Sequence, residues 1–308
     1  MNQMISVVQL VLPIFAVVFL GVLARKKSMF SPGEIQAFQR FVIEFCLPCL
    51  LFQSCLTAQL GAEALTGLLV PVVLLATTVW GFRVGKKWFP YFNTPFAFCC
   101  KETGMMGIPL FMILFGAEQA YRMGILNLTQ AIVGFPMMAI MSSSSASAAS
   151  PKKILGEMIR SPLILMSIGG MALNLTGVWT WMRGIGVDQI VTDTFDYLSQ
   201  PVSMIMLFCV GYNFTMTPEN TREILKMSAV HVVVFLIVGL VLQGALCLFP
   251  GVDAMTRWTM VIYAILPASF LLPSFGKCQL DSNITSGVCS VTTAVTLAAF
   301  CMVAVIVS

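Results

Sequence analysis

The chain has 308 residues, of which 58% are hydrophobic and only 10% charged, with a net charge of +4 and a mean hydropathy of +0.92. A soluble domain carries roughly a quarter charged residues, so this composition excludes that class and indicates an all-α integral membrane protein in a lipid bilayer. The basic residues lie in short clusters between apolar runs, so we expect no nucleic-acid partner.

The apolar runs predict ten membrane-spanning helices, since one span needs about 20 mostly apolar residues. The first five lie near residues 5–24, 38–57, 63–84, 95–116 and 121–141, and the second five near 161–181, 190–213, 226–249, 256–275 and 284–307. A polar stretch rich in serine and alanine separates the two sets. We therefore expect a five-helix repeat at 1–141, a linker at 142–160 and a second five-helix repeat at 161–308.

The distribution of basic residues predicts the orientation. With the N-terminus outside, 14 of the 17 lysines and arginines lie on the cytoplasmic side of the predicted spans and three lie outside. Cytoplasmic loops carry the excess of basic residues. Both termini are therefore expected to be non-cytoplasmic and the linker cytoplasmic.

An odd number of spans in each half means that a repeated half inserts upside down relative to the first. Three proline pairs support such a repeat, at offsets of 149, 153 and 158 residues. The pairs are Pro13 with Pro162, Pro48 with Pro201, and Pro109 with Pro267. The alternative is that these prolines are unrelated helix kinks.

The predicted fourth span contains a break. Gly104, Gly107 and Pro109 interrupt an apolar run, and Pro267 and Ser269 stand in a similar setting in the ninth span. Glycine and proline leave some backbone groups without helical hydrogen bonds. In a membrane such groups are tolerated only when they are buried in protein or line a wet cavity. Interrupted spans at matching positions in two halves point to a transporter's binding site. An ordinary proline kink is the alternative reading of each segment.

Charged residues inside spans are candidates for binding or ion coupling. Lys101 and Glu102 precede the first break, where they either hold substrate and a proton or cation, or screen each other at a cytoplasmic entrance. Glu44 is either a coupling site or the partner of Arg40. His231, the chain's one histidine, is either a proton relay or a packing residue bonded to a carbonyl.

The last predicted span is rich in hydroxyl groups, including Thr292 and Thr293. They suit close helix packing or a polar face directed at the breaks. Nearly all of the cysteines lie in apolar runs, and no second ligand pair accompanies Cys46 and Cys49, so we expect no metal site and no cofactor. No pair of intramembrane aspartates supports an enzyme.

Four motifs along the chain resemble those of the auxin efflux carrier family. They are Phe-Val-Ile-Glu-Phe-Cys-Leu-Pro at 41–48, Gly-Met-Met-Gly-Ile-Pro-Leu at 104–110, Leu-Pro-Ala-Ser at 266–269 and Ser-Val-Thr-Thr at 290–293. The resemblance covers essentially the whole chain. It implies two inverted five-helix repeats whose fourth and ninth helices cross at their prolines, with helices 1, 2, 6 and 7 as a scaffold and homodimer interface.

The resemblance also implies a function, that of a secondary transporter of small organic anions such as malonate or malate in a bacterial cell membrane. The implied site comprises Lys101, Glu102, Thr103, Gly104, Gly107, Pro109, Pro267, Ser269, Thr292 and Thr293, with Glu44, Glu102 or His231 as a proton or sodium coupling group. Glu44 and Glu102 stand where the family often has asparagine. A sodium symporter resembling bile-acid carriers and a non-transporting sensor or assembly subunit are the alternatives.

Overall fold

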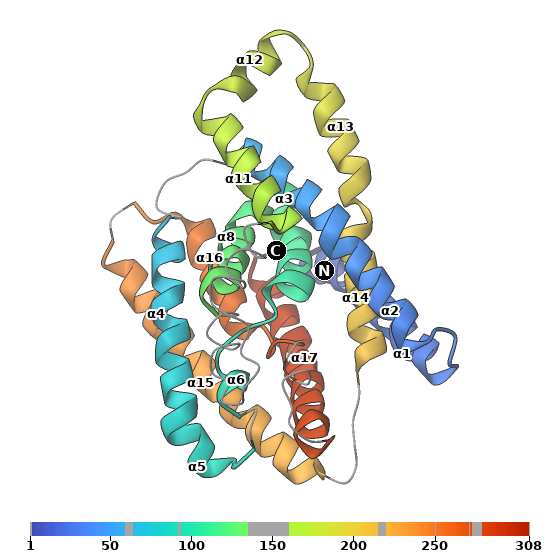
Figure 1. Ribbon diagram of the computed structural model, residues 1–308, viewed down its shortest axis with the longest axis vertical. Coiled ribbons are helices and arrows are strands. Elements are labelled where there is room, and N and C mark those ends of the chain that lie inside the picture. The colour runs from blue at the N-terminus through green and yellow to red at the C-terminus, as the bar shows by residue number, and fades with distance from the viewer. Residues whose placement is uncertain are drawn as a thin grey trace.

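The computed structural model describes residues 2–58, 64–91, 94–134, 160–214, 220–249, 251–270, 272 and 279–307. The regular structure in these ranges is helical, apart from an isolated β-bridge between two single residues. Figure 1 shows long helices lying side by side, with α12 and α13 forming an arch at one end of the molecule.

The helices of the first half follow the first five predicted spans in position. They are α1 (Asn2–Lys26), α2 (Pro32–Phe41), η1 (Val42–Cys46), α3 (Leu47–Leu56), α4 (Ala64–Trp80), η2 (Gly81–Gly85), α5 (Lys86–Trp88), α6 (Thr94–Ala97), η3 (Thr103–Gly107), α7 (Ile108–Phe115), η4 (Ala117–Gln119), α8 (Ala120–Thr129) and η5 (Gln130–Gly134). Residues 135–159, which hold nearly all of the predicted linker, lie outside the described residues.

The helices of the second half follow the other five predicted spans. They are α11 (Pro162–Leu175), α12 (Val178–Gly184), α13 (Asp188–Ser199), α14 (Pro201–Asn213), α15 (Thr221–Cys247), α16 (Ala254–Ile265) and α17 (Gln279–Val307). Besides the ninth span, whose helix ends at Ile265, two of these spans are not continuous. Gly177, with φ of +74°, bends the chain by 70° between α11 and α12, and the helix predicted at 190–213 is divided before Pro201.

Length and hydropathy set how many of these helices can cross a bilayer by themselves. Among the described residues, four are long and apolar enough, and the bent pair of α11 and α12 makes up to five. The four are Pro32–Leu56, Leu69–Trp88, Thr221–Cys247 and Leu280–Val307. The chain is therefore an apolar, helical membrane protein, and the count of ten spans stays a prediction.

Two prolines each follow a widened helical turn. The π-turns Val42–Cys46 and Thr103–Gly107 end two residues before Pro48 and Pro109. In each, an amide near the turn's end reaches back five residues, from Leu47 to Val42 and from Ile108 to Thr103. A proline interrupts the regular bonding of the turn before it because it has no N–H, and the wider turn re-pairs part of that turn.

One group of helices packs by close backbone contact. α1 lies along α14, and α3 along α11 and α13. A Cβ at Gly211 on α14 would overlap the Val18 carbonyl oxygen of α1, and one at Gly170 on α11 would overlap the Phe52 carbonyl oxygen of α3. Small residues that let backbones approach are a main means of joining helices in membranes.

The remaining helices enclose the two breaks. α15 packs on α16 and α17, and α8 contacts α4, α7, η3 and α16. The buried side chains among them include Phe98, Phe111, Phe235 and Tyr263. These helices hold the segments 98–107 and 266–270 inside the protein, where their irregular backbone is shielded from lipid.

Candidate functional site

Both interrupted spans contain residues without helical hydrogen bonding, but in the first these are residues 98–102, just before Gly104, Gly107 and Pro109 rather than at them. In the first, α6 ends at Ala97 and regular structure resumes at Thr103. In the second, α16 ends at Ile265, and Leu266, with φ of −60° and ψ of 152°, is extended. A residue before proline disfavours the helical region, so Pro267 explains why the helix ends there. Pro273 and Lys277 lie outside the described residues.

The two breaks meet as a short antiparallel pair. Lys101 and Ala268 form an isolated β-bridge. The amide of Glu102 donates to the carbonyl of Pro267 at 3.0 Å, and the amide of Ser269 donates to the carbonyl of Cys100 at 3.2 Å. The crossing, as we call residues 100–107 and 266–270, therefore satisfies part of the backbone that each break frees.

Two side chains occupy the outer edges of this pair. The Gln130 amide accepts from the Lys101 N–H at 2.9 Å and donates to the Lys101 carbonyl at 2.6 Å. On the other side, the Thr292 hydroxyl accepts from the Ala268 N–H at 3.3 Å. Gln130 thus bonds to both backbone groups of Lys101, as a neighbouring β-strand would. The sequence analysis missed it, because one glutamine in an apolar run gives no sign of its partner.

The Lys101 side chain is turned toward the second half of the chain and is only 1% exposed. Its ammonium group donates to the Leu266 carbonyl, lies 3.2 Å from His231 Nε2 and sits 3.7 Å from the centre of the Phe235 ring. His231 Nδ1 lies 2.9 Å from the Ala97 carbonyl oxygen. The histidine therefore contacts both a carbonyl, as one sequence reading expected, and the candidate lysine.

The Glu102 carboxylate is turned to different partners and is 7% exposed. Oε2 accepts from the Phe270 N–H at 2.8 Å and from the Ser269 hydroxyl at 3.5 Å, and Oε1 accepts from the Met105 N–H at 3.3 Å. No lysine or arginine of the described ranges forms an ion pair with it. Lys101 and Glu102 are thus adjacent in sequence but held by separate sets of groups.

The small residues of the first break are in close contact with neighbouring helices. Thr103 donates to Asn127 Oδ1 at 2.7 Å, and a Cβ at Gly104 would lie 3.3 Å from the same oxygen. A Cβ at Gly107 would lie 2.8 Å from Leu266 Cδ1. These positions leave little room for a larger side chain. Asn127 was also missed as a site residue.

The other predicted positions are less closely tied to the crossing. Thr293 donates to the Cys289 carbonyl within α17 at 2.7 Å. Glu44 lies on an outer face, where Oε1 is 3.3 Å from Arg40 Nε and the side chain is 47% exposed. This is the ion pair that was one reading of Glu44. Pro109 is buried at the start of α7.

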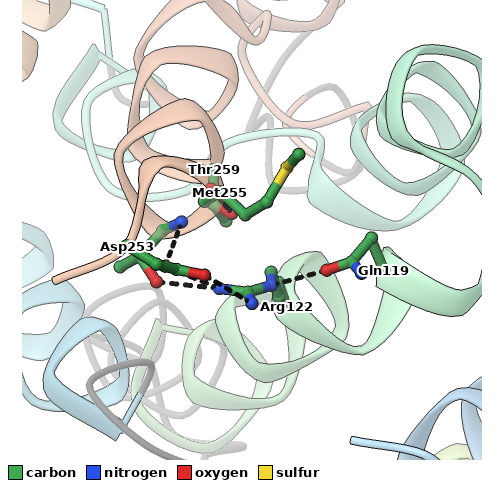
Figure 2. A network of polar contacts seen from close by, with 6 residues as sticks. Gln119, Arg122, Asp253, Met255 and Thr259 are labelled. Carbon is green, nitrogen blue, oxygen red and sulfur yellow. Dashed lines mark hydrogen bonds and ion pairs between the residues drawn. The ribbon is translucent and has the colours of Figure 1, made fainter. Parts of the chain in front are cut away.

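A second polar cluster joins the two halves at one end of α8 and α16. Figure 2 shows Arg122 between Gln119 and Asp253, with NH1 3.0 Å from Asp253 Oδ1 and NH2 2.8 Å from Oδ2. Asp253 also caps α16 by accepting from the Thr256 amide at 2.9 Å. Burial opposes ionisation of Asp253, but hydrogen bonds from Thr256 and the contact with Arg122 outweigh it, so its pKa is lowered.

Within the described ranges, no group of three or more histidine, cysteine, aspartate or glutamate side chains is arranged to hold a metal ion. The crossing offers hydrogen-bond donors, one buried ammonium group and one buried carboxylate. Such a set can bind a small charged molecule by hydrogen bonds and charge.

Comparison with known proteins identifies the family of this chain. A family model described as membrane transport protein matches residues 6–306, and that match spans both breaks and all of the described helices except a few terminal residues. A search of curated proteins finds no match. The family is one of transporters rather than of enzymes. The chain therefore belongs to the membrane transport protein family, the auxin efflux carrier family that its helix motifs resemble.

Proposed function

We propose that this membrane transporter moves a small organic anion, a mono- or dicarboxylate of the malonate or malate kind, and binds it at the crossing. The observation that carries the proposal is the bridge of Lys101 with Ala268. It brings the ends of two interrupted helices, backbone amides and a buried ammonium group to one point. Amides at helix ends and a nearby cation favour a carboxylate there.

The proposed architecture is ten spans in two inverted repeats, residues 1–141 and 161–308, joined by a cytoplasmic linker at 142–160. The two edge contacts support it, since Gln130 follows α8 in the fifth span and Thr292 lies on α17 in the tenth. Equivalent spans of the two halves thus hold the backbone of the break in their own half. Such a matching pair of contacts is what a repeated half would produce.

Transport would proceed by elevator-like alternating access. The packing of α1 with α14 and of α3 with α11 and α13 supports a scaffold built from helices 1, 2, 6 and 7. The remaining helices, which surround the crossing, would move as one body. Large apolar side chains such as Phe45, Leu165 and Met204 are exposed on the scaffold helices. They would face lipid or a second copy in a homodimer.

The coupling ion in this proposal is a proton or sodium. Glu102 is the best-placed coupling group, because it is buried beside the second break. His231 reaches the site only through Lys101, and Glu44 is paired with Arg40 on an outer face. A sodium symporter is the second candidate. A non-transporting sensor or assembly subunit is the third, and it predicts no flux of any substrate.

We further propose that the protein resides in the bacterial cell membrane with both termini outside the cytoplasm. The support is the excess of lysine and arginine on one side of the predicted spans. Labelling of single cysteines introduced at Ser161 and Thr176, at the two ends of α11, in intact cells tests the orientation. Thr176 should react with an impermeant reagent and Ser161 should not.

A two-step experiment tests the function. The purified protein is heated with malonate, malate, monocarboxylates and amino acids, with and without sodium and at two pH values, to find compounds that raise its unfolding temperature. Compounds that do so are then tested for uptake into proteoliposomes, with protein-free liposomes as the control. We expect carboxylate uptake, and sodium dependence would favour the symporter. Absence of flux for every stabilising compound would contradict a transport function.

A further inference from the structure

The Glu102 carboxylate already uses the hydrogen-bond donors that an anionic substrate would need. Its two oxygens accept from the amides of Met105 and Phe270 and from the hydroxyl of Ser269. Met105 belongs to the first break and the other two donors to the second. A carboxylate of this chain therefore bridges the two interrupted helices at the crossing.

This carboxylate differs from an ordinary structural one because the part of the chain that the structure describes pairs it with no counter-charge. Among the described residues no lysine or arginine pairs with it, and the neighbouring Lys101 is directed at His231 and the Leu266 carbonyl. The hydrogen bonds of this buried carboxylate within the described residues come from three neutral donors. Neutral donors bind any carboxylate of suitable size, so they do not distinguish Glu102 from a substrate.

We propose that Glu102 occupies the substrate's carboxylate position in this conformation and takes up one proton when the substrate replaces it. The inference rests on the proposed function, since it requires an organic anion at the crossing. In this inference, Glu102 competes with the substrate for the same hydrogen-bond donors. It also takes up one proton for each anion that binds.

Charge explains why displacement and protonation go together. Two ionised carboxylates in one buried set of donors repel each other, and a displaced carboxylate without donors would be left unpaired in protein. Addition of a proton from the entry-side solution forms an O–H bond on one Glu102 oxygen and removes its negative charge. The acid is then a donor and can bond to the arriving carboxylate.

The other titratable groups around Glu102 are not arranged to take this proton. Lys101 and His231 contact each other, and neither is a hydrogen-bond partner of the Glu102 carboxylate among the described residues. Cys100 precedes Lys101, and Cys289 on α17 donates its thiol to the Ser269 carbonyl at 3.3 Å. Neither thiol is a hydrogen-bond partner of the Glu102 carboxylate, whereas a proton on Glu102 itself removes the charge that competes with substrate.

Calorimetric titration of the full-length protein with malate tests the inference. Titrations in two buffers of different ionisation enthalpy give the number of protons taken up for each malate bound. Between pH 6.5 and 7.5 we expect one proton per malate and about tenfold tighter binding for each unit of decrease in pH. Glu102→Gln should bind malate with no proton uptake and no pH dependence, and Glu102→Asp should keep the proton uptake.

Glu223→Gln is the matched control, because Glu223 pairs with Lys226 at the start of α15 away from the crossing. It should behave as the parent does. Infrared difference spectra should show a protonated carboxyl band on addition of malate to the parent and no such band in Glu102→Gln. Malate binding without proton uptake in the parent, or with unchanged uptake in Glu102→Gln, overturns this inference and leaves the proposed function standing. Binding of malate to neither protein contradicts the proposed function and this inference with it.

Discussion

Lys101 and Ala268, which are 167 positions apart, lie opposite each other in an antiparallel bridge between two interrupted helices. The bridge fixes the direction of the side chains on either side of it. Lys101 is held by Leu266 and His231, and Glu102 by Ser269 and Phe270. The backbone pairing is thus what brings a cation and an anion to the same crossing without an ion pair between them.

The first prediction concerns the hydrogen bonds between the Gln130 side chain and the Lys101 backbone. Gln130→Leu removes the partners of the Lys101 N–H and carbonyl, both buried. Each backbone group left without a partner costs about 1–3 kcal/mol, so the unfolding temperature in detergent should fall clearly. Gln243→Leu is the control, because Gln243 also bonds to a carbonyl, that of Arg257, but at an exposed position. Equal changes in the unfolding temperature of the two variants would contradict a stabilising role for the Gln130 bonds to Lys101.

The second prediction concerns acid stability. The folded-state pKa of Asp253 lies below its ordinary value of about 3.9. Its contribution to folding is therefore complete above that value and is lost as the pH falls through the lower folded-state pKa. Asp253→Asn should unfold at a lower temperature than the parent near neutral pH, and the difference should shrink below about pH 4. Because Asp253 is partly exposed, we expect the effect to be under about 1 kcal/mol.

Arg122→Lys tests the geometry of the same contact. The guanidinium group reaches both oxygens of Asp253, which a lysine ammonium group cannot do in the same way. Arg122→Lys should therefore lose most of the stability that Arg122→Ala loses. Full retention of the parent's unfolding temperature would show that only the charge matters.

The third prediction concerns the contact between α1 and α14. Gly211→Ala introduces a Cβ that would overlap the Val18 carbonyl oxygen and lie 2.8 Å from its carbonyl carbon. The two helices must separate, and we expect a loss of folded protein or a strongly lowered unfolding temperature. Gly244→Ala in α15 is the control, since no atom lies within 4 Å of its added Cβ, and it should be neutral or slightly stabilising.

The fourth prediction concerns the proton on His231. Its Nε2 faces the Lys101 ammonium group and so must accept, which leaves the proton on Nδ1, directed at the Ala97 carbonyl. Because His231 is the one histidine of the chain, ¹⁵N spectra of histidine-labelled protein report on it alone. We expect the Nδ1-protonated form at neutral pH. A proton on Nε2 would contradict the contact with an ammonium group.

The approximate positions of the breaks could be predicted from sequence because glycine and proline act locally. Pro267 marks the second break directly, whereas Gly104, Gly107 and Pro109 lie in the helical turns that follow the first. The partners of Lys101 could not be predicted in the same way. His231 is 130 positions away, and whether an ammonium group faces a carboxylate or an imidazole depends on how the spans pack.

The residues that hold the crossing together were also beyond reach of local patterns. Gln130 is one polar residue in an apolar run, and only the position of the first break relative to η5 gives it a role. Arg122 stands at the start of the predicted fifth span, and its partner Asp253 comes from the other half of the chain. The bend at Gly177 was missed because hydropathy continues through it.

The measurement that tests the account most directly is carboxylate uptake by proteoliposomes containing Lys101→Ala or Pro109→Ala. Lys226→Ala, at an exposed salt bridge of α15, is the matched lysine control. With each variant shown to be folded by its unfolding transition, we predict that uptake falls to the level of protein-free liposomes in Lys101→Ala and Pro109→Ala and stays at the parent's level in Lys226→Ala. Unchanged uptake in the first two, for every substrate that the parent moves, would contradict a binding site at the crossing.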